Sequence, residues 1–431
     1  MNQNRKEMRT KRQGISAAST RGEKIKCLMP HFNFANLKQC FYELANNKAV
    51  GIDGISKEEY GKNLDANIED LITRLKGLSY KPKPARQVLI PKSNGKTRPL
   101  SIPSIEDKIV QLMFKKTLEA IYEPIFLDCS HGFRPNRSAH DAVRRTREFL
   151  RENTTSHVID VDLENFFGEI PHNKLLALLE MKISDKRYIR YINRLLKSGV
   201  MIDHTYYASS KGSGQGSIVS PILANIYAHY CIDKWFTEEV TPRLDHRAKL
   251  VRYADDLCIF LNKEIDIPKV QLALEGRLKR FDLRINQEKS RTLILDKHKF
   301  WISRQPTFDF LGFTFYLGVS RNGRCIPMVK TSSKKLRSAL KEINLWMKAN
   351  RSKLKLSDLH QNLCAKLRGH LQYFAVTFNS RAISVFIHHA KLIFFKWINR
   401  RSQKRSMNWK KFQLFDIAHP LPQPRISHRL F

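Results

Sequence analysis

A short stretch near the middle of the chain, Lys249–Leu261 (KLVRYADDLCIFL), constrains the fold more than any other. It sets two adjacent aspartates, Asp255 and Asp256, between two apolar runs that are rich in β-branched and aromatic residues. Such runs predict a β-hairpin with the aspartates at or beside its tip. Two neighbouring carboxylates repel each other, so burying both is costly unless a cation or solvent compensates their charge. Because Asp also favours turns for its own sake, the pair alone leaves open a plain turn or a divalent-metal site.

A second acidic stretch could supply the partner carboxylate that a metal site needs. His157–Val161 predicts a strand, and its alternation places Asp160 and Asp162 on one face. Asp is a poor strand former, so acids inside a β-branched strand are unusual. A polar, open strand face would explain them. A metal-binding carboxylate at the end of the strand is the functional alternative.

The net charge indicates the kind of partner. The chain has 77 Lys and Arg against 40 Asp and Glu, a net charge of +37. Self-repulsion on this scale is expected of a protein whose partner is a polyanion, so we expect nucleic acid. No run of 18 or more apolar residues is present, and the seven scattered cysteines include no Cys-x-x-Cys pair. We therefore expect no membrane partner, no zinc site and no disulfide framework.

Two further segments have the residue types that bind phosphates. Residues 86–103 predict a hairpin that carries Lys92 and Arg98, and we interpret it as a basic flap that grips an anionic ligand, or else as a solvated surface turn. Gly212–Ser217 (GSGQGS) precedes a predicted helix over Ile218–Ile232, and its glycines would allow the backbone to approach a phosphate or base. On its own this segment could equally be a linker.

Helical periodicity dominates the two ends of the chain. Residues 1–26 are basic with little apolar periodicity, which predicts a mobile or partner-ordered arm. Residues Phe32–Leu78 predict helices, one of them with Ser56 as N-cap and Glu59 at capping-box spacing. From Ile326 to the end, 22 Lys and Arg accompany three acids, and apolar spacing predicts three amphipathic helices. Between the ends we predict helices over 105–122, 139–150 and 270–281, a hairpin over 200–207, and strands over 292–295 and 308–315.

The order of these segments resembles the seven-block pattern of reverse transcriptases. The blocks read KTRPLSIP, SHGFRP, DVDLENFF, QGSIVSPILANIY, RYADD, NQEKS and FLGFTF. Their wording resembles bacterial group II intron-encoded proteins, and AKLRGHLQYF and KWINRRSQKRSMNWKKF resemble the maturase (X, or thumb) region and carboxyl end of that family. The resemblance runs from about Phe32 to the terminus. It implies an α+β fold of the right-hand polymerase type, with fingers, a palm built on an antiparallel sheet, and a basic helical thumb.

The same resemblance implies a division of the chain into functional domains. Residues 1–80 would form a basic arm and N-terminal helices, 81–325 the fingers and palm, 326–395 the thumb or maturase (X) domain, and 396–431 a basic tail. No His and Cys cluster of an HNH endonuclease follows Pro424. We therefore expect a form without target-strand cleavage that takes its primers from another source, such as replication forks.

Individual roles follow from the resemblance as well. Asp162, Asp255 and Asp256 would hold two Mg²⁺ ions, for which Mn²⁺ could substitute. Lys289 would be a general acid toward pyrophosphate. In the family pattern, the metal-binding Asp is followed by four residues and then by an aromatic residue. This spacing favours Asp162 over Asp160.

That aromatic residue is Phe167, which would lie under the sugar and exclude a 2′-hydroxyl. Lys92 and Arg98 would clamp the incoming triphosphate, while Gln215 and Gly216 would touch the nucleotide and the template. The remaining residues implied to contact nucleic acid are Arg134, the primer-grip residues Phe310, Leu311 and Gly312, and the thumb residues Arg368 and Gly369.

The resemblance therefore implies an RNA-directed DNA polymerase that also binds its own intron RNA as a maturase for splicing and retrotransposition. Its partners would be structured intron RNA, an RNA template with a DNA primer, dNTPs and target DNA, in the bacterial cytoplasm, at the nucleoid or in a ribonucleoprotein. Two alternatives stay open: a free-standing group II-like reverse transcriptase in DNA repair or phage defence, and an RNA-binding maturase with a vestigial polymerase. The three intact aspartates and Gln215 argue against the vestigial polymerase, and a non-enzymatic basic scaffold is least favoured.

Overall fold

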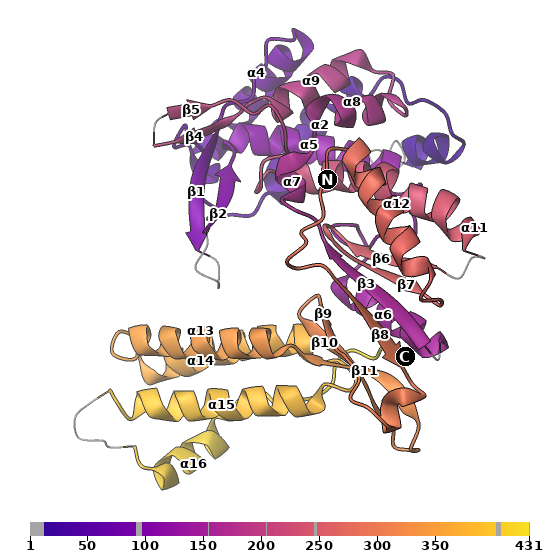
Figure 1. The fold of residues 1–431 in the computed structure, drawn as a ribbon. Helices are drawn as coiled ribbons and strands as arrows, with labels where there is room; N and C mark the ends of the chain where they lie inside the picture. The colour runs from indigo at the N-terminus through magenta and orange to yellow at the C-terminus, as the bar shows by residue number, and fades with distance from the viewer. Residues whose placement is uncertain are drawn as a thin grey trace. The chain divides into compact units, whose positions relative to one another are not determined.

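The computed structural model describes residues 13–91, 97–153, 155–203, 205–244, 248–401 and 407–430. These residues form an α+β fold with several small sheets (Figure 1). The fold divides into two compact units that interleave along the chain. Unit 1 comprises residues up to 138 and residues 159–291, and unit 2 comprises residues 139–158 and those from 292 onward.

Unit 1 is built mainly of helices packed around one apolar core. Ile68, Ile109 and Phe114 are among its fully buried side chains. The predicted N-cap is confirmed, because the Ser56 side chain accepts a hydrogen bond from the amide of Glu59. The helices of unit 1 are η1 (Met29–His31), α2 (Phe34–Glu43), α3 (Lys57–Lys62), α4 (Leu64–Lys76), α5 (Ile105–Tyr122), α7 (Phe166–Glu169), α8 (His172–Glu180), α9 (Lys186–Leu196), α10 (Ser220–Ala228), η2 (His229–Asp233), η3 (Phe236–Val240), α11 (Thr241–Arg243) and α12 (Asp266–Arg280).

Two helices of unit 1 differ in their bounds from those expected. The helix expected over Ile218–Ile232 begins two residues later, as α10, and continues through the π-helical turns η2 and η3. The helix expected from Val270 begins at Asp266, because Pro268 is compatible with a first helical turn.

The basic arm expected over residues 1–26 is only partly described, and the described part packs on unit 1. Residues 13–20 are helical, and Ile15 is buried in the core. The buried Ser19 hydroxyl donates a hydrogen bond to the carbonyl oxygen of Ile121 at 2.6 Å. Residues 13–20 are therefore part of the folded unit, contrary to the expectation of a mobile arm there.

Two four-stranded sheets contain the predicted hairpins and both acidic stretches. The first has the order β2-β1-β4-β5 and consists of β1 (Ala85–Pro91), β2 (Thr97–Ile102), β4 (Val200–Ile202) and β5 (Thr205–Tyr207). Its antiparallel β1–β2 and β4–β5 pairs confirm both predicted hairpins. The second has the order β6-β7-β3-β8 and consists of β3 (Thr155–Asp162), β6 (Lys249–Tyr253), β7 (Asp256–Leu261) and β8 (Arg291–Asp296). The turn between β1 and β2 lies outside the described residues.

Unit 2 combines a three-stranded sheet with a helical bundle. The sheet has the order β11-β10-β9, from β9 (Phe308–Phe310), β10 (Phe313–Val319) and β11 (Cys325–Thr331). The helices are α6 (Ala139–Glu152), η4 (Lys299–Trp301), α13 (Ser333–Asn350), α14 (Leu356–Phe374), α15 (Ser380–Ile398) and α16 (Trp409–Ala418). Helices α13, α14 and α15 confirm the three predicted amphipathic helices, which share a core around Met347, Leu363 and Phe394.

Three features of unit 2 differ from the expectations. The single strand expected over 308–315 is two strands, β9 and β10, because Leu311 and Gly312 both adopt positive φ angles of 51° and 80° and turn the chain. Strand β11 was not predicted, and neither was α16 within the expected basic tail. No helix in the described ranges is both long and apolar enough to cross a bilayer.

Candidate active site

The Asp-Asp stretch forms the predicted hairpin. Strands β6 and β7 pair antiparallel with Tyr253 opposite Asp256, which leaves Ala254 and Asp255 as a two-residue turn. Ala254 has a φ of +58°, a conformation that residues other than Gly, Asn and Asp seldom adopt. The strands on both sides bury their apolar side chains, Val251 among them, and so hold the turn at the end of a rigid hairpin.

Strand β3 brings two more carboxylates to this turn. It lies next to β7 in the sheet and ends at Asp162, with Asp160 two residues earlier. Burial raises the pKa of Asp255, and the charge of Asp162 raises it further. Burial also raises the pKa of Asp256 to about 7, with contributions from the charges of Asp255, Asp162 and Asp160. These shifts indicate that the four carboxylates share one electrostatic site.

Two cations form ion pairs with the carboxylates of β3. Lys289 Nζ lies 2.8 Å from Asp162 Oδ1, and Arg291 Nε lies 3.2 Å from Asp160 Oδ2. The hydrogen bond to Asp162 is the main reason that the pKa of Lys289 is raised. Within the described part of the chain, no ion pair reaches the carboxylate of Asp255 or its neighbour in the hairpin.

The loop that carries Lys289 also fixes the backbone at the end of β3. The amide of Asn286 donates to the carbonyl oxygen of Asp162 at 2.9 Å. The amide of Asp162 in turn donates to Ser290 Oγ at 3.1 Å. The end of β3 is therefore held by hydrogen bonds with two residues of the NQEKS block, Asn286 and Ser290.

The donor atoms at this site fit a hard divalent cation. Asp162, Asp255 and Asp256 offer carboxylate oxygens only, the ligand type that Mg²⁺ prefers. A dication would also offset the mutual repulsion that raises the pKa values of Asp255 and Asp256. Across the described residues, no three acidic, His or Cys side chains already converge as a complete metal-binding group. The carboxylates therefore fit Mg²⁺ sites in which waters and substrate phosphates complete the coordination.

A pair of residues implied to contact the nucleotide lies on β2 and the glycine-rich segment. Arg98 Nε donates to Gln215 Oε1 at 2.9 Å, and the amide of Ser101 donates to the carbonyl oxygen of Gln215 at 2.6 Å. Gly216 has a φ of +106°, and a Cβ at this position would lie 2.4 Å from Ser101 O. The structure thus brings Arg98, Gln215 and Gly216 together, whereas Lys92 lies outside the described residues.

Phe133, Phe167 and Tyr253 form an aromatic cluster at the hairpin, and of these only Phe167 was predicted as a site residue. Phe167 is half-buried and packs edge-on against Phe133, with 6.2 Å between the ring centroids. Phe133 is 50% exposed and also lies 6.4 Å from the ring of Tyr253, directly before the turn. The sequence signal for the other two was their position in the blocks SHGFRP and RYADD: Phe133 directly precedes Arg134, and Tyr253 lies two residues before Asp255.

Arg134 makes internal contacts that the sequence did not predict. Its guanidinium is buried and pairs with Glu123 at 2.8 Å. Arg134 Nη1 also donates to the carbonyl oxygens of Leu127 and Ser130 at 2.8 and 2.9 Å. Four of the five N–H groups of Arg134 are used inside the protein, so these bonds give it a structural role, and its contact with nucleic acid stays a prediction.

The remaining predicted residues lie in unit 2. Phe310 ends β9, and Leu311 and Gly312 form the β9–β10 turn, whose Leu311 carbonyl oxygen accepts a hydrogen bond from Tyr373 at 2.9 Å. Arg368 and Gly369 lie on α14 and are both exposed. Their contacts with nucleic acid stay predictions.

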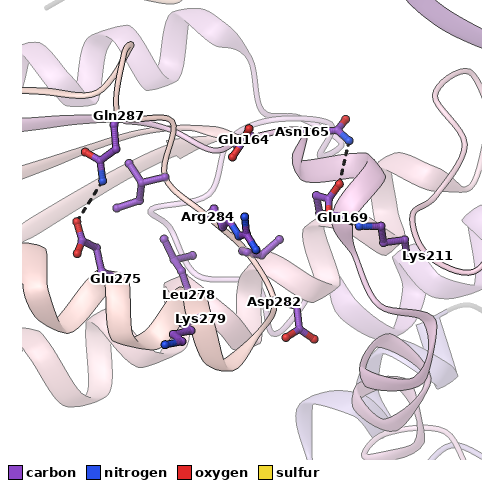
Figure 2. Close-up of a pocket in the computed structure, with 12 residues that line it drawn as sticks. Glu164, Asn165, Glu169, Lys211, Glu275, Leu278, Lys279, Asp282, Arg284 and Gln287 are labelled. Atoms are coloured by element: carbon purple, nitrogen blue, oxygen red, sulfur yellow. Dashed lines mark hydrogen bonds and ion pairs between the residues drawn. The ribbon is translucent and has the colours of Figure 1, made fainter.

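A cleft of about 1100 Å³ opens beside the loop that contacts Asp162 (Figure 2). Its lining includes Glu169 and Lys211, an ion pair at 2.5 Å, and Arg284, whose carbonyl oxygen accepts from the amide of Glu164 at 2.9 Å. The wall continues through Gln287, two residues before Lys289. The cleft therefore shares a loop with the carboxylate site.

Comparison with known proteins gives a consistent result. A family model described as reverse transcriptase (RNA-dependent DNA polymerase) matches residues 90–315. The group II intron-encoded protein LtrA of Lactococcus lactis subsp. cremoris is 35% identical over 231 residues, which are 48% of this chain and 38% of LtrA. The protein YkfC of Escherichia coli (strain K12) is 32% identical over 274 residues, which are 56% of this chain and 71% of YkfC.

A fungal protein is also similar. An uncharacterised 91 kDa protein in the cob intron of Schizosaccharomyces pombe is 39% identical over 213 residues, which are 49% of this chain and 26% of that protein. The match thus covers between about a quarter and two fifths of the fungal protein and LtrA. The matched family region, residues 90–315, contains all four carboxylates of the site.

Proposed function

The chain belongs to the reverse transcriptase (RNA-dependent DNA polymerase) family, and from this premise we propose that it extends a DNA primer with dNTPs on an RNA template. The observation that carries the proposal is the electrostatic coupling of Asp162 with Asp255 and Asp256, together with Arg98, which acts on Asp255 and pairs with Gln215. Asp255 and Asp256 have no ion-pair partner among the described residues, and their carboxylate oxygens are suitable ligands for a divalent cation. A polyanionic substrate also agrees with the net charge of +37.

The carboxylates would hold two divalent ions, Mg²⁺ by preference and Mn²⁺ as a substitute. Asp162 and Asp255 would be shared ligands, with Asp256 as the third acid. Ions of this kind activate the primer hydroxyl and stabilise the leaving pyrophosphate. Of the other residues, Arg98 would bind phosphate oxygens through its guanidinium. Phe167 would lie under the sugar of the incoming nucleotide and exclude a 2′-hydroxyl. Lys289 would donate a proton toward pyrophosphate.

The finer architecture would be that of a right-hand polymerase. The β2-β1-β4-β5 sheet with the N-terminal helices would form the fingers, and the β6-β7-β3-β8 sheet would form the palm. The helices α13, α14 and α15 would form the thumb, which corresponds to residues 326–395, and α16 would belong to the tail 396–431.

We further propose that the protein binds structured intron RNA and acts as a maturase. The relative LtrA is named a group II intron-encoded protein, and the segment from Ile326 onward has 22 Lys and Arg against three acids. Exposed Arg368 on α14 is a candidate contact. Such a protein would work in a ribonucleoprotein in the bacterial cytoplasm, with target DNA as a further partner. Because the affinity would come mainly from phosphate contacts, RNA binding should weaken steeply with salt.

Primer extension tests the polymerase proposal. The reaction contains an RNA template, a DNA primer, dNTPs and Mg²⁺, and compares the wild type with Asp255→Ala. We expect extension by the wild type and none by the variant, while both retain salt-sensitive RNA binding in a filter assay. No extension by either protein, with RNA binding intact, would instead favour a maturase without polymerase activity.

A further inference from the structure

The catalytic turn rests on a buried arginine to which the proposed chemistry gives no role. Arg252 stands two residues before the turn residue Ala254, and its side chain is fully buried, as is that of its partner Asp233. Its Nε and Nη2 atoms bind the two oxygens of Asp233 at 2.7 and 2.6 Å. A bidentate pair of this kind fixes the plane of the guanidinium, because two parallel bonds prevent its rotation.

The other donors of Arg252 reach the turn and the elements around it. Nη1 donates to Asn225 Oδ1 at 3.0 Å and to the carbonyl oxygen of Ala254 at 3.1 Å. Nη2 also donates to Ser130 Oγ at 2.7 Å. All five N–H groups of the guanidinium are therefore used. The bond to Ala254 is the one that falls on the turn itself, and it fixes the peptide that joins Ala254 to Asp255.

The loop Cys129–Gly132 packs closely against the same turn. Its backbone exchanges two hydrogen bonds with the backbone of Arg252, at 2.7 and 2.9 Å. Asn225 Nδ2 donates to the carbonyl oxygen of Gly132 at 2.7 Å. A Cβ at position 132 would lie 2.6 Å from the nitrogen of Ala254, so a larger residue would have to displace the turn. The unusual φ of Ala254 is thus held by contacts from two directions.

The helix that carries Asp233 is adapted to this arrangement. The segment η2 (His229–Asp233) is π-helical, and Arg277 donates to two of its carbonyl oxygens at 2.9 and 3.0 Å. A π-helical turn closes its hydrogen bonds one residue later than an α-helical turn, which rotates the following residues around the helix. Asp233, at the end of this segment, faces the guanidinium of Arg252.

We propose that Arg252 is a positioning residue for divalent-ion binding. Anchored on Asp233, it holds the carbonyl of Ala254 and so keeps Asp255 in the orientation that receives the ion. This inference rests on the proposed function, because it takes Asp255 as an ion ligand. A lysine at position 252 could keep the charge pair with Asp233 but, with a single ammonium group, could not also hold the turn.

The test is a Mn²⁺ titration of the full chain without nucleic acid, with free Mn²⁺ measured by electron paramagnetic resonance. Arg252→Lys should raise the apparent dissociation constant about 10-fold, the range in which residues behind a metal ligand act. Gly132→Ala perturbs the turn from the opposite side and leaves the Arg252–Asp233 pair in place. Gly132→Ala should also raise the apparent dissociation constant for Mn²⁺. It keeps the inference testable if Arg252→Lys does not fold.

Arg74→Lys is the matched control, because Arg74 forms a bidentate pair with Glu106 elsewhere in unit 1. It should lower the melting temperature and leave the affinity for Mn²⁺ unchanged. If both Arg252→Lys and Gly132→Ala bind Mn²⁺ as tightly as the wild type, the positioning role is wrong. If Asp255→Asn also binds Mn²⁺ like the wild type, the metal assignment of the proposed function fails as well, so the two failures are distinguishable.

Discussion

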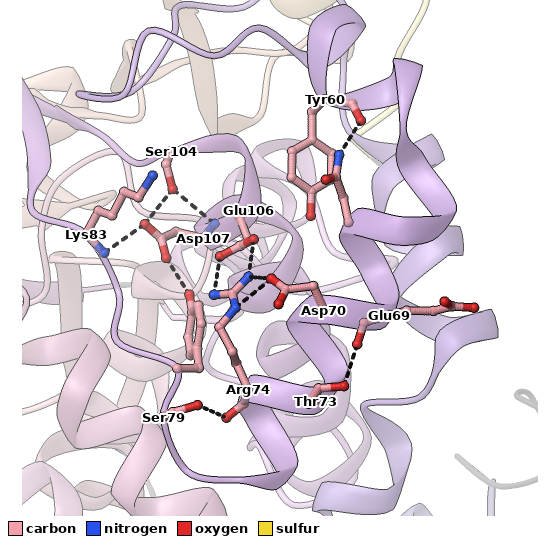
Figure 3. A network of polar contacts seen from close by, with 12 residues as sticks. Tyr60, Glu69, Asp70, Thr73, Arg74, Ser79, Lys83, Ser104, Glu106 and Asp107 are labelled. Atoms are coloured by element: carbon pink, nitrogen blue, oxygen red, sulfur yellow. Dashed lines mark hydrogen bonds and ion pairs between the residues drawn. The ribbon is translucent and has the colours of Figure 1, made fainter.

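Two acidic sites in unit 1, one at α5 and one at the β6–β7 hairpin, differ in how their carboxylates are satisfied. At α5, Asp107 is 2% exposed, and both of its oxygens accept hydrogen bonds (Figure 3). The donors are the hydroxyls of Tyr80 and Ser104 and the amide of Lys83. The neighbouring Glu106 is paired bidentately with Arg74 at 2.9 and 2.7 Å. We call these residues the α5 network.

At the turn of the β6–β7 hairpin the carboxylates have fewer donors: a backbone hydrogen bond lowers the pKa of Asp255, and no hydrogen bond lowers that of Asp256. Asp255 and Asp256 are half-buried, and no ion pair in the described part of the chain reaches them. Burial raises the pKa of Asp107 as well, but its hydroxyl and amide donors act against that shift. The pKa of Asp256 has no comparable hydrogen-bonding donor to lower it. The two places therefore differ in how many donors meet a carboxylate, and a carboxylate with a raised pKa and few donors is the better candidate for a functional site.

The largest effect should come from removing the charge of a shared ion ligand. Asp162→Asn keeps the shape of the side chain but loses its charge, so we expect primer extension to fall about 1000-fold or more, without a lower melting temperature. Asp160→Asn is the control on the same strand face, and it should cost less than about 10-fold because Asp160 is already paired with Arg291. A larger loss for Asp160 than for Asp162 would reverse the assignment of the metal ligand.

The α5 network should behave in the opposite way. Asp107→Ala would leave the buried hydroxyl of Tyr80 and the amide of Lys83 without an acceptor, and we expect a loss of about 2–4 kcal/mol in the free energy of unfolding. Differential scanning fluorimetry would show a lower melting temperature, while the Mg²⁺ dependence of extension by the folded protein stays the same. A changed Mg²⁺ dependence would mean that the α5 network supports the carboxylate site, and the two places would then not be functionally separate.

Asp256 should destabilise the metal-free protein at neutral pH. Its pKa is about 7 in the folded protein against an ordinary value of 3.8, so the folded state binds the proton more tightly. Stability contributed by this group is therefore lost as pH rises from about 4 to about 7. Asp256→Asn should gain on the order of 1–2 kcal/mol at pH 8 in EDTA, after discounting for solvent, and little at pH 3.5. Thermal melts at the two pH values measure this, and a variant that is less stable at pH 8 would contradict it.

The smallest effect should come from an exposed ion pair on the cleft, between Lys211 and Glu169. Lys211 is 55% exposed, and its hydrogen bond is the main reason that the pKa of Glu169 is lowered. Exposed ion pairs contribute little, so Lys211→Met should change the free energy of unfolding by less than about 0.5 kcal/mol. Melting curves at low and high salt would check this, and a loss above about 1 kcal/mol would show that the cleft beside it depends on this pair.

Local sequence patterns were sufficient for the β6–β7 hairpin and for helices α13, α14 and α15 of unit 2. In both cases the apolar period is uninterrupted, so burial and local preference favour the same structure. The β9–β10 turn was missed because Leu311 stands at positive φ, where a sequence normally signals a turn with Gly or Asn. Strand β11 contains Pro327 and Lys330, which weaken a strand pattern.

The polar partnerships could not be predicted because they join distant parts of the chain. Arg134 reads like a surface arginine in a polar loop, and only the fold reveals Glu123 beside it. Asp233 lies 19 residues before Arg252, inside what reads as an ordinary helix. The hairpin and the acids of β3 could be placed in one site only through the family resemblance, since strand order in a sheet is set by long-range packing.

The interleaving of the two units has a consequence for synthesis of the chain. Helix α6 buries Val143 and Leu150 in unit 2, and Arg147 donates to the carbonyl oxygen of Pro327 on β11, 180 residues later. At ribosomal rates of about 5–20 residues per second, α6 emerges roughly 10–40 s before its partner strand exists. During that interval the apolar face of α6 has to be kept from aggregating, so unit 2 completes its fold late in translation. A nascent chain that ends before β11 therefore lacks the strand to which α6 bonds in the folded protein.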